Sequence, residues 1–365
     1  MISVYIHIPF CIRKCLYCDF VSYVRTEEVQ KAYIDRLIKE IEDCSVAETV
    51  DTVFIGGGTP SVLSFQDTER LVNALRNQFA FAPDCEFSIE VNPGTVTLDK
   101  LRAYRRLGVN RLSIGLQSCD NLQLKTLGRI HTYEDFVKTF AEAREAGFDN
   151  VNVDLMSAIP GQTTQSYIDT LQKVLLLAPE HISAYSLIVE EGTPFASMEL
   201  DLPEEEDERE MYYETKRILK EAGYERYEIS NYSKPGFACR HNVGYWTGKE
   251  YLGFGTAAAS FYLNVRKCNQ RDADDYIQNG PLPEEEVMLT KDDLMSEFFF
   301  VGLRMMKGVS EREFERRFGE SFENRFGAVM QKHIDAGLLA KKDGILCLTE
   351  KGIDVSNYVL CDFIL

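Results

Sequence analysis

The sequence is poor in positive charge and has no long apolar run. Its 40 lysines and arginines stand against 58 aspartates and glutamates, which gives the 365-residue chain a formal net charge of −18. Because basic patches neutralise a nucleic-acid backbone, this balance argues against nucleic acid as a partner. No stretch of about 20 apolar residues is present, so no transmembrane segment is predicted. The first residues also lack the basic segment and apolar run of a signal peptide.

The cysteines do not have the spacing of a disulfide framework. Ten are present, and three of them fall within eight residues of a chain far longer than a small secreted domain. This arrangement favours metal ligation over disulfides, and we expect a reducing, cytoplasmic compartment. No chemical role is assigned to six scattered cysteines: Cys44, Cys85, Cys119, Cys268, Cys347 and Cys361.

The first half of the chain alternates between strand and helix patterns. Candidate strands lie at Ser3–Ile8, Thr52–Ile55, Glu86–Val91, Arg111–Gly115, Val151–Met156 and Ile182–Ile188. The segments between them repeat apolar residues at three- and four-residue steps, which is typical of helices. Such alternation implies a parallel sheet with right-handed crossovers. A closed eightfold barrel needs two more units, so we predict an α/β fold built on an open, six-stranded partial (β/α)6 barrel of the TIM type.

Three regions are predicted along the chain. Residues 1–200 form the barrel. Residues 201–290 form a barrel extension and linker, which opens with an acid-rich helix start and continues without a clear period. Residues 291–365 return to helical patterns and include a hairpin of Leu338–Lys342 and Ile345–Leu348. This order of helices and hairpin suggests a smaller, α+β, winged-helix-like C-terminal domain.

The strongest chemical signal is the segment Cys11-Ile-Arg-Lys-Cys15-Leu-Tyr-Cys18. Four cysteines would close a 4Fe–4S cluster for electron transfer, whereas three leave one iron open. An open position is what binding of a substrate or cofactor at a metal requires. The alternative is a structural zinc site, which normally takes four nitrogen or sulfur ligands. No fourth cysteine or histidine follows in this loop, so the cluster is the better interpretation.

The CxxxCxxC spacing, with an aromatic residue before the last cysteine, is the signature of radical S-adenosylmethionine proteins. Further strings resemble the coproporphyrinogen III oxidase-like members of that superfamily, and within them the heme-chaperone branch. They are Tyr5-Ile-His-Ile-Pro-Phe-Cys11, Cys18-Asp-Phe20, Gly56-Gly-Gly-Thr-Pro60, Glu90-Val-Asn-Pro-Gly94, Gly115-Leu-Gln-Ser118, Leu127-Gly-Arg129, Asp154-Leu-Met156, Tyr227-Glu-Ile-Ser-Asn-Tyr232 and His241-Asn-x-x-Tyr-Trp246. The resemblance therefore extends over most of the sequence.

The resemblance implies S-adenosylmethionine as a second cofactor. Residues matching Tyr5, Gly57 and Glu90 contact it in the family. Further matching residues line a second S-adenosylmethionine or a substrate position in the oxidase: Tyr17, Gly58, Thr59, Gln117, Arg129 and Asp154. The predicted fold agrees, because the carboxyl ends of parallel strands form one rim where ligands bind.

Structural roles remain open for several of these positions. The three glycines could form a plain turn after a strand. Glu90 could be a surface carboxylate, and Arg129 could form a surface salt bridge instead of clamping a carboxylate.

Two departures separate the chain from the oxidase. Phe20 stands where the oxidase has a further cysteine, and Tyr5 lies too near the start for the oxidase's N-terminal extension. Both argue against coproporphyrinogen oxidation and for the heme-chaperone branch.

A second constellation consists of Cys239, His241, Tyr245 and Trp246. A heme needs a soft or imidazole axial ligand and an apolar wall, so His241 and Cys239 are each candidate heme ligands. The alternative is a hydrogen-bonded, packed histidine. The following string Gly253–Ser260 is poorer in glycine than is usual in the family, which counts against heme binding.

Three functions compete at this point. The resemblance implies a heme chaperone that binds heme and delivers it to acceptor proteins such as respiratory enzymes. The second possibility is a radical enzyme, either oxidase-like or a methyltransferase, that uses a 5′-deoxyadenosyl radical. The third is an electron-transfer or structural cluster protein, against which the full set of rim residues argues. No residue is assigned a catalytic role.

Overall fold

The computed structural model describes residues 1–365, and its centre is a curved parallel sheet. Six neighbouring strands run in chain order: β1 (Ile2–Ile8), β2 (Val50–Gly57), β3 (Phe81–Val91), β4 (Arg111–Gln117), β5 (Val151–Ser157) and β6 (His181–Ser186). Every neighbouring pair among them is parallel. The predicted open, six-stranded partial barrel is confirmed, since β1 and β6 do not pair with each other.

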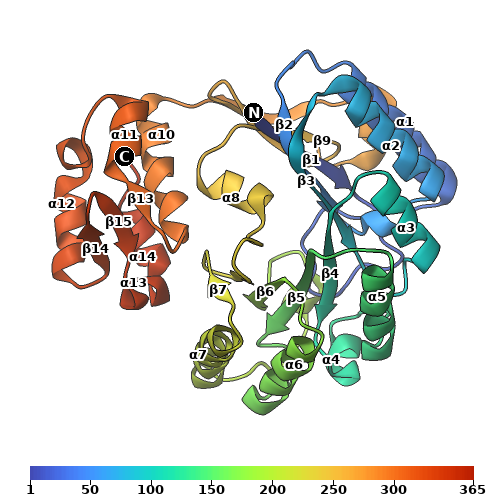
Figure 1. Ribbon diagram of the computed structural model, residues 1–365, viewed down its shortest axis with the longest axis horizontal. Coiled ribbons are helices and arrows are strands. Elements are labelled where there is room, and N and C mark those ends of the chain that lie inside the picture. Colours follow the sequence, from blue (N-terminus) through green and yellow to red (C-terminus); the bar gives the residue numbers. More distant parts are fainter.

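Helices cover the outer face of this wall, on the right of Figure 1. They are α1 (Glu27–Glu42), α2 (Phe65–Gln78), α3 (Leu98–Arg106), α4 (Asn121–Thr126), α5 (Tyr133–Glu145) and α6 (Thr164–Leu176). Side-chain caps fix several starts, as where Ser64 accepts the Asp67 backbone N–H. The apolar faces of these helices and the sheet bury a core of 47 hydrophobic residues. The sheet and its helices therefore share one continuous hydrophobic core.

The sheet continues beyond the barrel on both sides, to twelve strands in all. Next to β1 lie β9 (Tyr251–Phe254), β10 (Ala259–Tyr262), β11 (Val265–Asn269) and β12 (Pro283–Met288), and next to β6 lie β8 (Asn231–Ser233) and β7 (Glu225–Arg226). Helix α7 (Glu205–Glu221) carries four acidic residues in its first turn, as its sequence predicts. Helices α8 (Arg240–Trp246) and α9 (Ala273–Asn279) complete this region. The stretch without a clear period thus consists mainly of short strands.

The C-terminal module has its own core. It contains α10 (Lys291–Phe300), α11 (Glu311–Phe318), α12 (Phe322–Asp335), α13 (Glu350–Asp354) and α14 (Ser356–Cys361), with a sheet of β13 (Val309–Ser310), β15 (Ile345–Leu348) and β14 (Leu339–Lys342). Sixteen buried hydrophobic residues form this second core. The predicted hairpin is present, and the smaller winged-helix-like domain is confirmed. In Figure 1 the module stands opposite the open side of the barrel, with α8 between them.

Short 3-10 helices occur at Pro60–Val62 (η1), Pro194–Ser197 (η2) and Gly302–Arg304 (η3). No helix combines the length and apolar character needed to cross a membrane.

Candidate functional site

The three clustered cysteines lie on the loop that follows β1. The loop is anchored at both ends, because the Cys11 N–H donates to the Tyr23 carbonyl (3.0 Å) and the Leu16 N–H donates to the Leu127 carbonyl (3.0 Å). Cys11, Cys15 and Cys18 are free thiols of intermediate exposure. All three line one cavity, so a single cofactor can reach them.

The arrangement of these thiols suits a cluster better than a single ion. No three His, Cys, Asp or Glu side chains converge as the ligands of one metal ion would. A zinc site requires such convergence. In a cubane cluster each thiolate binds a different iron, so the sulfur atoms stay apart. The residues present fit a 4Fe–4S cluster, and the zinc alternative lacks its geometry.

Neighbouring polar groups act on the thiols. The Thr59 hydroxyl donates to Cys11 Sγ (3.3 Å), and Arg129 Nη1 donates to Cys15 Sγ (3.7 Å). Burial raises the pKa of Cys11 and of Cys18, and the Thr59 hydroxyl acts against this at Cys11. A hydroxyl and a guanidinium beside the sulfur atoms favour the thiolate form that a metal needs.

A cavity of about 140 Å³ joins the cysteine loop to the strand ends. Eleven of the thirteen residues predicted from the sequence line it: Cys11, Cys15, Tyr17, Cys18, Gly57, Gly58, Thr59, Glu90, Gln117, Arg129 and Asp154. They come from the ends of five parallel strands and the loops that follow, so the rim is a product of the parallel topology.

Two predicted residues do not line this cavity. Tyr5 lies deeper in the barrel, where its hydroxyl contacts His7 Nδ1 (3.0 Å). His241 belongs to α8, and its ring lies beside Phe54 and Tyr5, with centroids 5.3 Å and 6.5 Å away.

The glycines after β2 allow close backbone approach. Gly57 has φ +111°, and a Cβ there would lie 2.6 Å from the His7 ring. A Cβ on Gly58 would lie 2.8 Å from the Phe10 carbonyl oxygen and 3.1 Å from Cys11 Sγ. Only glycine satisfies both positions. The glycines therefore do more than form a plain turn after β2. Gly58 also brings the end of β2 against the cysteine loop.

Glu90 is a partly buried carboxylate at the end of β3. The Gly57 N–H donates to Glu90 Oε2 (3.0 Å). Burial, and then the nearby Asp154 carboxylate, raise the pKa of Glu90 to about 8. A cationic group placed beside Glu90 would favour its ionised form. Glu90 is therefore not the surface carboxylate that the sequence left open as an alternative.

Arg129 connects the rim to the cysteine loop. Its Nη2 donates to Asn92 Oδ1 (2.6 Å) and to the Gly115 carbonyl (2.5 Å). Its Nε is buried without a partner, and it forms no ion pair. The surface salt-bridge alternative is therefore not observed.

Two further polar side chains complete the rim. Gln117 ends β4 with φ +74°, an uncommon conformation for a non-glycine residue that often marks a functional position. Asp154 accepts from Asn152 Nδ2 (2.7 Å) and from the Ser113 hydroxyl (3.4 Å), and burial raises its pKa. Sequence reasoning gave no role to Ser113. Ser113 could have been noticed as a polar residue between the apolar residues of a buried parallel strand.

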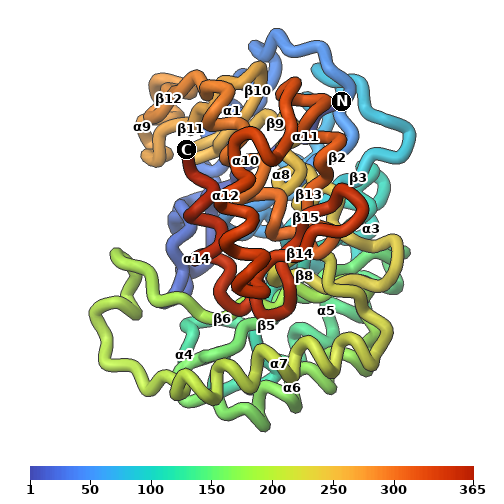
Figure 2. The backbone as a smooth tube through the Cα atoms, turned by 90° about the vertical axis from the view of Figure 1, so that its left-hand side faces the viewer, coloured from blue at the N-terminus to red at the C-terminus, as the bar shows by residue number.

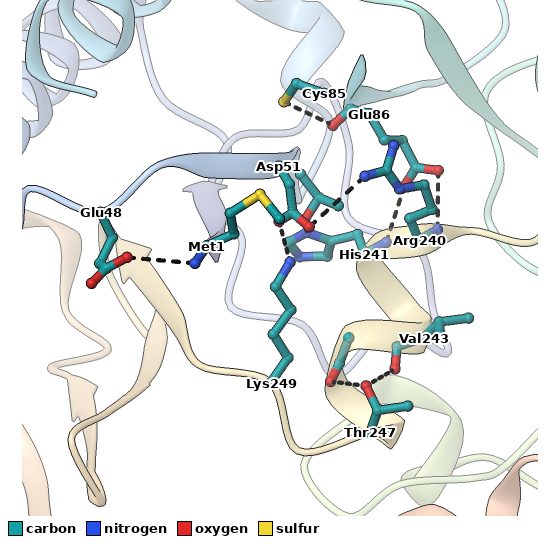
Figure 3. Close-up of polar contacts among 12 residues, drawn as sticks. Met1, Glu48, Asp51, Cys85, Glu86, Arg240, His241, Val243, Thr247 and Lys249 are labelled. Atoms are coloured by element: carbon teal, nitrogen blue, oxygen red, sulfur yellow. Dashed lines mark hydrogen bonds and ion pairs between the residues drawn. The ribbon is translucent and has the colours of Figure 1, made fainter. Parts of the chain in front are cut away.

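The second constellation lies on and next to α8, and Figure 3 shows its His241 beside Asp51, Arg240 and Lys249. His241 is 1% exposed, and its ring contacts the Thr52 hydroxyl through Nδ1 (2.9 Å) and the Tyr245 hydroxyl through Nε2 (3.0 Å). Its backbone N–H donates to Glu86 (3.0 Å). Burial lowers the pKa of His241 to about 3 and raises that of Cys239 to about 12. Both ring nitrogens are engaged, so the geometry favours the packed alternative over heme ligation.

Comparisons with known proteins find relatives along the whole chain. The Radical SAM superfamily model matches residues 5–174, and the HemN C-terminal domain model matches residues 289–355. The heme chaperone HemW of Lactococcus lactis is 37% identical over 100% of this chain and 97% of its own. That of Bacillus subtilis is 35% identical over 100% and 99%.

A solved structure is also similar along the whole chain. Coproporphyrinogen III oxidase (HemN) from Escherichia coli, described as a radical SAM enzyme, superposes with a TM-score of 0.88 at 27% identity. The match covers 100% of this chain and 90% of that one. From these full-length matches, together with the cysteine loop and its rim, the chain belongs to the HemW family of the radical SAM superfamily.

Proposed function

We propose that this protein is a heme chaperone that carries a 4Fe–4S cluster and S-adenosylmethionine. In this proposal Cys11, Cys15 and Cys18 hold the cluster, and the rim residues hold the second cofactor. The main support for this proposal is one cavity that is lined by three free thiols together with Glu90 and Gly57. Heme enters the proposal because full-length relatives bear the name heme chaperone.

Each residue of the rim has a physical task. Glu90 accepts hydrogen bonds from a cationic ammonium or from ribose hydroxyls, and the glycines let a ligand approach the backbone. Arg129 holds Asn92 and supplies positive charge beside Cys15. When bound, the cluster supplies a Lewis-acidic iron and one-electron chemistry. Asp154 and Gln117 line the side of the cavity that would face a further ligand.

The cofactor proposal is tested by anaerobic reconstitution. The wild-type chain should bind about four irons, as expected for a cubane cluster with three protein thiolates. Its electron paramagnetic resonance signal should change when S-adenosylmethionine is added. Cys15→Ala should lose the cluster, whereas Cys361→Ala, at an exposed cysteine far along the chain, should keep it. Retention of the full cluster in Cys15→Ala, or zinc as the sole metal, contradicts the proposal.

The chaperone proposal is tested by heme transfer. Hemin-loaded protein is mixed with an apo heme protein, with apomyoglobin as a convenient probe, and the acceptor's absorption is followed after separation. Transfer faster than from free hemin controls supports the function. A chain that binds no hemin contradicts it.

A radical enzyme is the second candidate, favoured by the likeness in fold to the oxidase and by the complete rim. Phe20, which is 68% exposed where the oxidase has a cysteine, argues against the oxidase reaction itself. Anaerobic incubation with coproporphyrinogen III, S-adenosylmethionine and a reductant should give no protoporphyrinogen. Product at enzymatic rates, with 5′-deoxyadenosine, favours the second candidate.

A further inference from the structure

Asn92 directly follows β3 and lies between the two side chains that contact the cysteine sulfur atoms. Arg129 Nη2 donates to Asn92 Oδ1 (2.6 Å), and Asn92 Nδ2 donates to Thr59 Oγ1 (2.7 Å). Arg129 also contacts Cys15 Sγ, and Thr59 contacts Cys11 Sγ. The strand β2, which leads to Thr59, lies beside β3 in Figures 1 and 2. Asn92 therefore joins the contacts of two different cysteines into one hydrogen-bonded chain.

The hydrogen bonds of this chain can run in only one direction. A guanidinium has donors and no acceptor, so the Asn92 atom that faces Arg129 must be its oxygen. The amide nitrogen then faces Thr59 and donates to the hydroxyl oxygen. The single hydrogen of the Thr59 hydroxyl is left to donate to Cys11 Sγ (3.3 Å). Asn92 thus makes Thr59 a donor to sulfur, although a hydroxyl can act either as donor or as acceptor.

The backbone of Asn92 is held from behind. Its N–H donates to Ser61 Oγ (3.2 Å), and its carbonyl accepts from the Thr95 hydroxyl (2.7 Å). Lys100 Nζ donates to the Ser61 and Leu63 carbonyls (2.6 and 2.7 Å), which ties η1 to α3. Because Ser61 is fully buried, these contacts leave Asn92 little freedom to shift.

Gly115 leaves the space in which Asn92 and Arg129 meet. A Cβ at this position would lie 2.7 Å from Asn92 Oδ1 and 3.1 Å from Arg129 Nη2. Gly115 is not among the glycines with a positive φ, so its backbone conformation is open to other residues. The close approach of this hydrogen-bonded pair is therefore the reason for glycine here.

A donor beside a cysteine sulfur changes the redox chemistry of a bound cluster. Hydrogen bonds to the sulfur atoms are among the factors that set the reduction potential of an iron–sulfur cluster. Such a donor withdraws negative charge from the thiolate, and it favours the reduced state because that state carries one more electron. The effect is strong in a partly buried site, where water screens little of the interaction.

We propose that Asn92 is a positioning residue that raises the reduction potential of the cluster by holding the Thr59 hydroxyl as a donor to Cys11. The inference rests on the proposed 4Fe–4S cluster. Because the same Asn92 side chain accepts from Arg129, it sets the donors to Cys11 and Cys15 together. A change at Asn92 therefore acts on both cysteines without removing either thiolate.

The potential is measured by electron paramagnetic resonance during a reductive titration of reconstituted protein, without S-adenosylmethionine. Thr59→Val keeps the shape of the side chain and removes the hydroxyl, so the equilibrium constant for reduction should fall at least about threefold. This fall corresponds to about 30 mV towards more negative potential, since tenfold is about 59 mV for one electron. Thr59→Ser keeps the hydroxyl and should restore most of the wild-type potential.

Asn92→Asp separates a positioning role from a merely structural one. The carboxylate keeps the contact with Arg129 but offers no donor, so the Thr59 hydroxyl turns to the carboxylate and leaves Cys11. The potential should fall, and adding Thr59→Val should then lower it by less than Thr59→Val does alone. Asn73→Asp makes the same change at an exposed position on α2 and should leave the potential unchanged.

Gly115→Ala disturbs the Asn92–Arg129 pair without altering a hydrogen-bonding group, and the potential should fall in this variant too. If Thr59→Val holds no cluster, Asn92→Asp and Gly115→Ala decide the outcome. Wild-type potentials in these variants overturn the inference while the cluster proposal stands. Fully additive shifts in the double variant overturn it as well, because Asn92 then does not act through Thr59. A wild-type chain that builds no cluster removes the proposed function itself.

Discussion

Gly57 stands at the end of β2, where its backbone packs against the His7 ring of β1. Its φ of +111° is strained for any side chain, and a Cβ would meet the His7 ring at 2.6 Å. Gly57→Val should therefore weaken S-adenosylmethionine binding by more than about 1 kcal/mol, measured by calorimetry on reconstituted protein.

Gly147→Ala is the control for this variant. Gly147 has φ +88° but no atom within 4 Å of an added Cβ, so it isolates backbone strain from steric contact. It should lower stability and leave ligand affinity unchanged. Equal affinities in wild type and Gly57→Val remove Gly57 from the site.

Glu90 makes cofactor binding depend on pH. Its pKa is raised to about 8 by burial and Asp154, so at pH 7 the carboxyl is mostly protonated without a ligand. A bound ammonium group favours the carboxylate, so binding must release a proton. Affinity for S-adenosylmethionine should therefore rise with pH up to about 8 and then level off. Calorimetry in buffers of different ionisation enthalpy detects the proton.

Glu90→Gln should bind more weakly and lose this pH dependence, because an amide does not titrate in the range. A wild-type affinity that is constant between pH 6 and 8 contradicts the role given to Glu90.

His241 contributes to stability through two buried hydrogen bonds. His241→Ala leaves the hydroxyls of Thr52 and Tyr245 without this partner and opens a cavity, which should cost about 2–4 kcal/mol of unfolding free energy. Because the folded-state pKa is about 3 against an ordinary 6.5, the unfolded chain binds the proton more readily between these values. The wild type should lose His241-dependent stability as pH falls from about 6.5 towards 3, which chemical denaturation at several pH values measures. An unchanged unfolding midpoint in His241→Ala at pH 7 rules this out.

At the scale of elements, the cysteine loop depends on a segment far along the chain. Residues 187–200 pack beneath it, and the Phe195 N–H donates to the Leu16 carbonyl (3.1 Å). Phe195 is 1% exposed, in a small cluster with Leu127, Met156 and Ile159. The loop that carries the thiols is thus positioned by tertiary packing as well as by β1.

Phe195→Ala should cost about 3 kcal/mol and loosen the loop without touching a thiol. We expect the reconstituted cluster to form in this variant but to decay faster in air, followed by its visible absorption. Met198→Ala, at a half-exposed residue of the same segment, is the control. Equal decay in both variants shows that the packing does not protect the cluster.

At the scale of the whole molecule, the chain folds around two separate hydrophobic cores. The barrel core has 47 buried hydrophobic residues and carries the cysteine rim, whereas the module core has 16. Other residues of the module line one side of a cavity of about 990 Å³ between the module and the barrel. Phe299 is fully buried in the second core, with the Phe326 ring 4.5 Å and the Phe363 ring 4.6 Å away between centroids.

Phe299→Ala should therefore destabilise the module by about 3–5 kcal/mol and leave the barrel folded. Thermal unfolding should show an earlier transition for the module. Iron content and S-adenosylmethionine binding should match wild type. Loss of the cluster in this variant contradicts the separation of the two cores.

The sequence alone determined what depends on local spacing and on periodic patterns. The cysteine loop is local, so its chemistry is readable from eight residues. The rim was predictable because parallel strands place their carboxyl ends together, which brings Gly57, Glu90 and Asp154 into one cavity whatever the details of packing. Strand boundaries were less certain, since β3 begins at Phe81 and not at Glu86. The first residues of β3 pair with β2, and this pairing leaves no pattern in the β3 sequence itself.

Tertiary structure alone decided everything that joins distant segments without a periodic signal. The role of His241 turned on Thr52, almost two hundred residues away, which engages a ring nitrogen that could otherwise bind a metal. The short strands β7 to β12 had no readable period, because each is stabilised by pairing with the sheet edge. The large cavity exists only because the module packs against α8. The residues that line it come from segments 245–266 and 289–318, whose contact depends on long-range packing and is not encoded in either segment alone.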